Sequence, residues 1–363
     1  MIETQAEFVL STKELKNDLT FFTNTLGMKL DSIYPADDPS VAVLSGHGVR
    51  VRIEKGTNHQ TGIIRINTTH PETFANGVLD LIAPNGTRIE IRELNPQFEI
   101  PSTKHSFVVR KLKDRTPWII GRAGMHYRDL IPDRLGGSII ASHIRIPDGG
   151  PVPDMVHYHK VGFQLIYCYK GWVDLVYEDQ GPAFRLFEGN CVIQPPEIRH
   201  KVLYASKNIE VIEIGVPAEH VTTIDHEMTL PNNSFNPDRL FSGQKFVHYV
   251  SAEATIADFR IQGLKSIDTM ISLNTGNVAG VQVVQATETE TEWTSHNADI
   301  LFNFVLEGKM TLHSKDQKIQ ELSEGDAFVT PPNFHSRYTD ISSNLKLLEV
   351  SLPGVFETAR INA

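Results

Sequence analysis

Hydrophobic positions in the first 96 residues follow the spacing of one helix and then of several strands. The helical part lies between a cap at Ser11-Thr12 and the stop signal Gly27, and its apolar residues recur every three or four positions: Leu15, Leu19, Phe22 and Leu26. Short apolar runs that predict strands lie at 8–10, 41–44, 49–53, 63–66, 78–82 and 87–91. Asn85-Gly86 predicts a hairpin turn between the last two runs. We therefore expect a small α+β module at residues 1–96.

From residue 118 onward the helical spacing nearly disappears. Runs rich in Val, Ile, Tyr and Phe alternate with Gly, Pro, Asn and Asp turns, a pattern typical of an all-β sandwich or barrel. Residues 97–117 and 221–242 lack this pattern and are predicted to be linkers. The chain is thus expected to be mainly β, with two β domains at 118–220 and 243–363.

The two β domains repeat one another. Landmarks of the first copy recur in the second at offsets of 135 to 137 residues: Gly171 and Gly308, Gly189 and Gly325, Pro195-Pro196 and Pro331-Pro332, His200 and His335, 211–213 and 347–349, Pro217 and Pro353. Because all these pairs share nearly one spacing, we infer a tandem duplication.

Composition excludes several classes of protein. The 363 residues are 40% hydrophobic and 21% charged, which excludes a disordered chain. The formal net charge of −10 argues against nucleic-acid or anionic-membrane partners. Cys168 and Cys191 imply no disulfide framework. We expect a cytoplasmic protein, with no membrane partner, that acts on a small molecule and forms a homo-oligomer, most simply a dimer.

Potential metal ligands gather in the first β domain. His157 and His159 alternate, so on a strand their side chains point the same way. Gln164 begins the next strand, and a return strand supplies His200. Two neighbouring histidines and a third from elsewhere can offer imidazole nitrogens to Fe, Mn, Ni, Cu or Zn.

The spacing of these residues resembles the cupin superfamily, whose first motif is G-x5-H-x-H-x3–4-E-x6-G and whose second is G-x5-P-x-G-x2-H-x3-N. The matching positions in this chain are Gly150, His157, His159, Gln164, Gly171, Gly189, Pro195 and His200. The chain departs from the motifs in one extra residue after Gly150, in Gln164 instead of Glu, and in Glu197 and Tyr204 instead of Gly and Asn. The resemblance implies a bicupin of two double-stranded β-helix barrels, with metal ligands at His157, His159, Gln164 and His200.

The second copy lacks most of these ligands. Aligned on Gly308, it has Thr294 and Leu301 in place of the first histidine and the glutamine, and it keeps His296 and His335. Two histidines without a third protein ligand rarely hold a metal firmly. We therefore expect the second barrel to be degenerate and structural, with a weak metal site as the less favoured alternative because Asn303 lies near these positions.

Three further residues are candidates for catalysis. Tyr204 follows His200 by four positions, so strand parity predicts that it shares the ligand face, although a core tyrosine is the commoner outcome. Arg122 and His126 precede the barrel and are expected near its mouth, where an arginine can clamp a carboxylate. Surface or inter-barrel salt bridges are the alternative for these two residues.

The N-terminal module resembles one βαβββ unit of the vicinal oxygen chelate superfamily, which includes glyoxalases. The matching residues are Phe21-Phe22, Leu26-Gly27-Met28 and the segment 83–90. The resemblance implies metal-ligand positions at Glu90 and near Glu7. Active members pair two such units, so we expect a scaffold, a dimer interface or a lid here.

The cupin resemblance implies a mononuclear metal-dependent enzyme. Three neutral imidazoles and a neutral amide leave a divalent metal with its full charge of +2, which favours a small anionic substrate that chelates through oxygen. Our leading interpretation is a non-haem Fe(II) dioxygenase; Zn, Ni or Mn fit the same ligands. Two alternatives remain open: a metal-dependent isomerase or lyase that acts through an enolate, and a non-catalytic binding or sensor protein.

Overall fold

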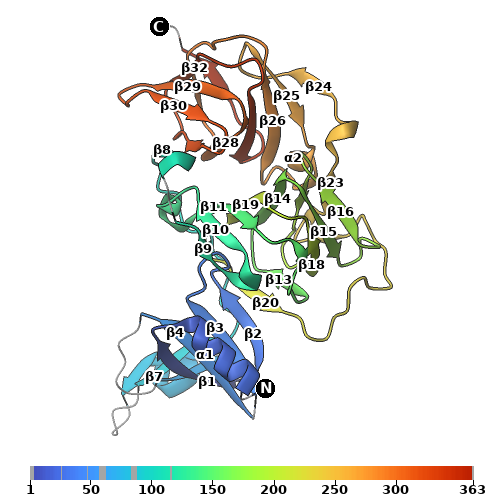
Figure 1. The fold of residues 1–363 in the computed structure, drawn as a ribbon. Helices are drawn as coiled ribbons and strands as arrows, with labels where there is room; N and C mark the ends of the chain where they lie inside the picture. The colour runs from blue at the N-terminus through green and yellow to red at the C-terminus, as the bar shows by residue number, and fades with distance from the viewer. Residues whose placement is uncertain are drawn as a thin grey trace. The chain divides into compact units, whose positions relative to one another are not determined.

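The computed structural model describes residues 4–25, 27–46, 48–56, 63–82, 88–114 and 117–361, and it is mainly β (Figure 1). Residue contacts divide the chain into two compact units. The first comprises Met1–Glu99, Met155–Lys160 and His220–Met228. The second comprises Ile100–Asp154, Val161–Glu219 and Thr229–Ala363. The five-part division at residues 96, 117, 220 and 242 remains a prediction.

The first unit is a twisted sheet with one short helix. Its elements are β1 (Thr4–Thr12), α1 (Leu15–Thr20), the π-helical turn η1 (Phe21–Thr25), β2 (Lys29–Tyr34), β3 (Val41–Gly46), β4 (Val49–Lys55), β5 (Ile63–Thr68), the 3₁₀ helix η2 (Pro71–Gly77), β6 (Asp80–Ile82), β7 (Arg88–Glu93), β13 (His157–His159) and β20 (Thr222–Ile224). The strand order is β13-β20-β2-β3-β4-β1-β5-β7-β6. The predicted linker 221–242 therefore contributes β20 to this sheet.

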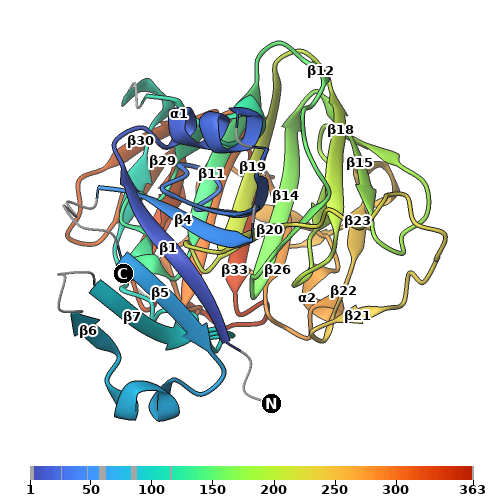
Figure 2. The ribbon, with the colours of Figure 1, turned by 90° about the horizontal axis from the view of Figure 1, so that it is seen from below.

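Helix α1 forms where the helical spacing predicts it and lies beside β4 (Figure 2). Thr12 caps its start, because the Thr12 hydroxyl oxygen accepts a hydrogen bond from the Glu14 amide at 2.9 Å. Leu15 is buried in a cluster with Ile33, Leu44 and Ile53. Strands β6 and β7 pair antiparallel as expected. The predicted turn at Asn85-Gly86 and the residue Leu26 lie outside the described residues.

The first barrel of the second unit is built from strands between Ile119 and Val216: β9 (Ile119–Ile120), β10 (His126–Asp129), β11 (Ile140–Ile146), β12 (Gly150–Pro151), β14 (Phe163–Lys170), β15 (Trp172–Tyr177), β16 (Phe184–Phe187), β17 (Cys191–Ile193), β18 (His200–Ala205) and β19 (Ile209–Val216). One sheet contains β17-β14-β19-β11-β10-β9, and the facing strands are β16-β15-β18 with β12. Two short strands, β21 (Leu240–Phe241) and β22 (Gln244–Lys245), form a hairpin after it.

The second barrel repeats this order: β24 (Ile256–Asp258), β25 (Leu264–Asp268), α2 (Ile271–Asn274), β26 (Gly280–Ala286), β27 (Thr294–His296), β28 (Ile300–Glu307), β29 (Lys309–Ser314), β30 (Gln320–Ser323), β31 (Ala327–Val329), β32 (Ser336–Thr339), β33 (Lys346–Leu352) and β34 (Thr358–Arg360). The row β31-β28-β33-β26 corresponds to β17-β14-β19-β11. Gly171 and Gly308 occupy the same turn with φ near +80° in both copies, a conformation that favours glycine. The tandem duplication is confirmed.

Each barrel contributes an edge strand to the sheet of the other. Strand β8 (Val108–Arg110) precedes the first barrel in the sequence, but it pairs with β31 of the second. Strand β23 (Val247–Tyr249) precedes the second barrel and pairs with β17 of the first. The predicted linker 97–117 is therefore structured, since it supplies β8.

Three apolar clusters hold the second unit together. The largest joins the barrels and takes Leu165 and Tyr167 from β14 and Phe302 and Phe304 from β28. Alternate residues of the same strands point the other way, into the lumen of each barrel. Cys168 belongs to the lumen cluster of the first barrel. Strand alternation thus supplies both an inter-barrel core and two separate lumens.

Candidate metal centre

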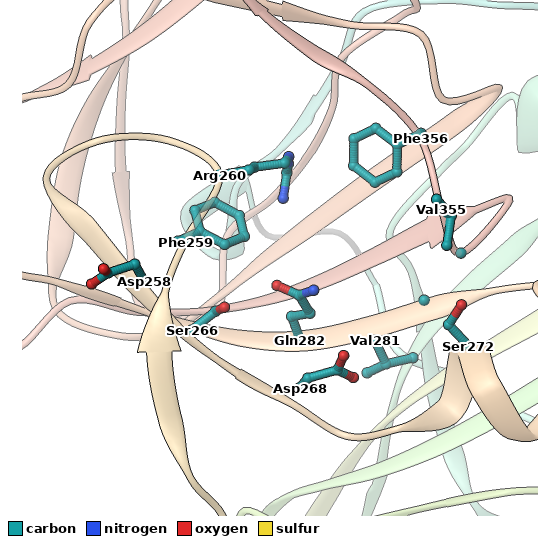
Figure 3. Close-up of a pocket in the computed structure, with 12 residues that line it drawn as sticks. Asp258, Phe259, Arg260, Ser266, Asp268, Ser272, Val281, Gln282, Val355 and Phe356 are labelled. Atoms are coloured by element: carbon teal, nitrogen blue, oxygen red, sulfur yellow. The ribbon is translucent and has the colours of Figure 1, made fainter.

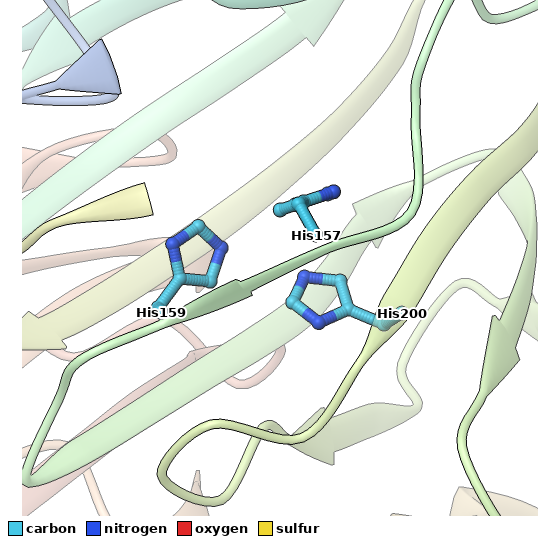
Figure 4. Close-up of side chains that lie close together, drawn as sticks. All are labelled: His157, His159 and His200. Atoms are coloured by element: carbon cyan, nitrogen blue, oxygen red, sulfur yellow. The ribbon is translucent and has the colours of Figure 1, made fainter. Parts of the chain in front are cut away.

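Three histidines predicted as ligands lie together. His157 and His159 flank Tyr158 on β13, with ring centroids 5.0 Å apart, and His200 begins β18. One ring nitrogen of each lies within 4.8 Å of the others, and the three side chains are buried (Figure 4). Among the described residues this is the single group of at least three His, Cys, Asp or Glu side chains with such a geometry.

Hydrogen bonds at Nδ1 set the tautomers of these histidines. Nδ1–H of His157 donates to the Met155 carbonyl at 2.7 Å, and Nδ1–H of His200 donates to the Ile198 carbonyl at 2.9 Å. Because a carbonyl only accepts, the lone pair of each neutral ring lies on Nε2. Nδ1 of His159 is 2.9 Å from the Thr222 hydroxyl oxygen on β20. Metal-binding histidines in proteins are oriented in this way.

Burial keeps His200 neutral. It lowers the pKa of His200 to about 4, while the hydrogen bond to Ile198 acts in the opposite direction. A neutral imidazole is the form that donates a lone pair to a metal. The site therefore offers His200 in its ligand form at neutral pH.

Gln164 lies on β14 and is 1% exposed. Its Nε2–H donates to Oε1 of Glu213 on β19 at 2.7 Å, which fixes the orientation of the amide because a carboxylate only accepts. The other amide atom, Oε1, is buried without a hydrogen-bond partner among the described residues. A buried acceptor in this state is expected to bind a cation, a water or a ligand donor.

Arg122 forms an ion pair inside the second unit. Its Nη1 contacts Oδ1 of Asp154, and Oδ2 of Asp154 accepts a hydrogen bond from the Val202 amide at 2.9 Å. Burial tends to lower the pKa of Arg122, but the attraction and hydrogen bond of Asp154, together with the nearby Tyr127 and Glu213, outweigh it, so the pKa is raised. Both charges contribute to the electrostatics of His200. Arg122 therefore makes a salt bridge, but this pair is buried within the first barrel and is neither the surface nor the inter-barrel contact that the alternative expected.

Tyr204 does not share the face of His200, so the parity argument was wrong. The pairing of β15 with β18 shifts, since Leu175 pairs with Val202 and Asp174 with Tyr204. This β-bulge inserts one residue and reverses the alternation beyond it. Tyr204 is 43% exposed and stacks on Trp172.

His126 lies on β10 next to Tyr127, which packs into the lumen cluster of the first barrel. Alternation on a strand therefore directs His126 to the opposite face. The expectation that His126 covers the mouth of this lumen is not supported by this placement.

Three residues of the site were missed from the sequence. Asp154 lies in the motif loop, and Glu213 belongs to the closing strand that marks the repeat; the sequence assigns neither a role in the site. Thr222 lies in a segment predicted as a linker, and its partner His159 is 63 positions away. The pairing of β13 with β20 brings them together, and local spacing carries no signal for it.

The carboxylates proposed as half a metal site in the N-terminal module are paired with arginines. Glu7 accepts from Arg50 at 2.7 Å, and Glu90 contacts Arg65 at 2.6 Å. These ion pairs use the oxygens that a metal needs. The glyoxalase-like resemblance itself remains a prediction.

Comparison with known proteins identifies the fold. No family model and no curated protein matches the sequence. A mutant of oxalate decarboxylase from Bacillus subtilis matches with a TM-score of 0.52 and 12% identity, over 72% of this chain and 82% of that chain. The formate complex of oxalate decarboxylase from Lactobacillus farciminis matches with a TM-score of 0.53 and 12% identity, over 72% of this chain and 91% of that chain.

These structural similarities show which fold the chain has, but they do not show which reaction it catalyses. No helix in the described part of the chain is long and apolar enough to cross a membrane. The matched structures are bicupins, and this chain contains two duplicated barrels in one unit. The chain therefore has the tandem cupin fold.

Proposed function

We propose that this protein is a mononuclear metal-dependent enzyme that acts on a small anionic substrate through a metal held by His157, His159 and His200. The observation that carries the proposal is the convergence of three buried imidazoles within 4.8 Å, with Nδ1 of two of them committed to backbone carbonyls. A divalent metal bound there supplies Lewis-acid chemistry.

Gln164 is proposed as a fourth ligand or as a donor-acceptor group beside the metal. Its Oε1 is the atom that remains for this role, because Nε2 is bound to Glu213. Glu213 orients the amide through this hydrogen bond. With four neutral donors the metal retains its charge of +2, which favours an anionic substrate with two oxygen donors.

The reaction class that we propose first is dioxygenation with Fe(II). A non-oxidative lyase or isomerase reaction is the second candidate, and one observation favours it: the structural neighbours are named oxalate decarboxylases, and the enzyme from Bacillus subtilis is described with Mn(II) centres. In either reaction the chain's own groups would bind and orient the substrate beside the three histidines.

Metal content and oxygen dependence test the proposal. We expect near-stoichiometric metal in the gently purified full-length protein by mass spectrometry, and its loss in His157→Ala. Candidate α-keto acids, enolates and diols are then assayed with and without O₂. Oxygen uptake with iron bound supports the dioxygenase, whereas anaerobic turnover supports the lyase or isomerase. Absence of metal from both proteins after incubation with Fe(II) or Mn(II) would overturn the proposal.

Gln164→Glu is expected to make stability depend more strongly on metal. Without metal the variant places a second carboxylate against Glu213 and removes a buried hydrogen bond, so the free energy of unfolding falls by ~1–3 kcal/mol. With metal the added charge strengthens coordination, so the increase in Tm on adding Mn(II) exceeds that of the wild type.

The control is Gln282→Glu in the second barrel. Residue 282 lies on β26 and pairs with Glu349, which is the repeat equivalent of Glu213. The variant therefore also places a second carboxylate next to a buried glutamate. Its Tm is expected to fall without recovery on adding Mn(II). Equal metal responses in the two variants would show that Gln164 does not face the metal.

A further inference from the structure

The second barrel contains a cavity of about 260 Å³ at one end of its lumen. Figure 3 shows Gln282 extending from β26 towards Arg260. In this view Phe356 lies to the upper right of Gln282, and Asp268 lies below it. The volume is slightly below the range of about 300–1,000 Å³ for drug-sized ligands. It therefore suits a small molecule.

A row of polar side chains crosses the lumen face beside this cavity. Asp268 pairs with Gln282, Gln282 with Glu349, and Glu349 with Asn303, on the adjacent strands β25, β26, β33 and β28. Directly paired residues share one face of a sheet. Val284 and Val305, two residues beyond Gln282 and Asn303, belong to the lumen cluster, so the row faces the lumen.

Several atoms of this row have no partner in the described structure. Asn303 is 1% exposed, and both its Oδ1 and its Nδ2 are buried without hydrogen bonds. Oε1 of Gln282 is buried in the same state. Unsatisfied buried polar groups cost ~1–3 kcal/mol each and are rare in native proteins unless water or a ligand completes them.

The charges around the cavity select against anions. Arg260 holds both oxygens of Glu349 at 2.6 Å and donates from Nε to the Thr358 hydroxyl at 2.8 Å. This pair is neutral as a whole, so the Glu349 carboxylate adds no net charge to the site. Asp258 and Asp268 then leave the lining with net negative charge, which repels anions.

Aromatic side chains complete one wall. The Arg260 guanidinium lies 4.2 Å from the centroid of the Phe259 ring and 4.6 Å from that of Phe356. These contacts, with the ion pair to Glu349, hold the guanidinium in one position. The polar groups are therefore arranged in advance and need little reordering to bind a ligand.

We propose that the second barrel is a metal-free binding site for a small uncharged polyhydroxylated molecule. A hydroxyl group both donates and accepts, so several hydroxyls on one ligand can satisfy the Gln282 acceptor, the Asp268 carboxylate and the remaining Arg260 donors together. Asn303, at the inner end of the row, does not line the cavity itself; its amide needs one donor and one acceptor, which a water held between it and the ligand would supply.

Binding to the full-length protein tests the site. The probes are D-glucose, D-ribose and myo-inositol, with D-gluconate and D-glucosamine as charged counterparts, screened by saturation-transfer NMR and measured by calorimetry. At least one neutral probe is expected to bind the wild type and His157→Ala with the same Kd. Gln282→Met and Asn303→Leu, which keep side-chain volume and remove the amide, are expected to weaken it at least ~10-fold.

A stability measurement separates a binding role from a structural one. If Asn303 is retained for a ligand, Asn303→Leu should raise the Tm of the ligand-free protein, because an unsatisfied amide is replaced by an apolar group of similar shape. Four results would overturn the proposal: no neutral probe binds, a charged counterpart binds more tightly, binding is lost in His157→Ala, or Asn303→Leu lowers the Tm while the Kd is unchanged.

Discussion

His200→Ala is expected to lose its bound metal. Three imidazoles form the proposed site, and His200 is the one ligand that comes from β18. Its removal leaves two imidazoles on β13 and at most the weaker amide oxygen of Gln164, too few strong ligands to hold a metal firmly. Loss of a group that only orients a ligand already costs ~10–100-fold in affinity, so loss of a ligand should cost more. Metal content after dialysis and titration with Mn(II) measure the effect.

The second barrel offers a matched control. His335 occupies the position equivalent to His200 in the repeat, and it belongs to no group of three potential ligands in the described chain. His335→Ala should therefore retain the metal of the wild type. If the two variants lose metal to the same extent, the histidines of the first barrel are not the metal ligands.

Phe304→Ala is expected to destabilise both barrels together. Phe304 is fully buried in the cluster that joins them, and its ring centroid lies 5.1 Å from Tyr169 and 5.7 Å from His143, both of the first barrel. Truncating a buried phenylalanine costs about 3–5 kcal/mol through lost transfer free energy and the cavity left behind. Chemical denaturation measures the change in the free energy of unfolding.

Phe235→Ala is the matched substitution on the surface. Phe235 is 69% exposed, so its truncation should change the free energy of unfolding by less than ~0.5 kcal/mol. Comparable losses in the two variants would mean that the inter-barrel cluster contributes little to stability. A transition that splits in two in Phe304→Ala would mean that this cluster couples the barrels.

The repeats and the histidine group could be predicted from sequence because their signals are local. Gly171 and Gly308 mark the same turn in each copy, and alternation over three residues is enough to place His157 and His159 on one face. The prediction for Tyr204 from strand alternation was wrong because a single inserted residue reverses which face the following side chains point to. Nothing in the sequence predicts a β-bulge at this position. A prediction from alternation therefore holds only as far as the strand is regular.

The polar row of the second barrel escaped sequence analysis for a different reason. Asp268, Gln282, Asn303 and Glu349 lie on four strands, and their spacing in the sequence gives no sign that they lie side by side. Only the register of three strand pairs aligns them. The absence of the histidine motif pointed to a structural barrel, which stays a prediction, and the polar row is the basis for the binding site proposed above.

The exchange of β8 and β23 affects how the chain can be made and divided. During synthesis on the ribosome, β8 emerges roughly 200 residues before β31. Strand β8 therefore stays unpaired until β31 has been synthesised. A fragment cut at residue 220 or 243 would leave the edge of β17 or β31 unpaired, and such edges promote aggregation. Although the two barrels arose as copies, neither repeat contains all the strands of its own sheet, so we expect that neither folds well by itself.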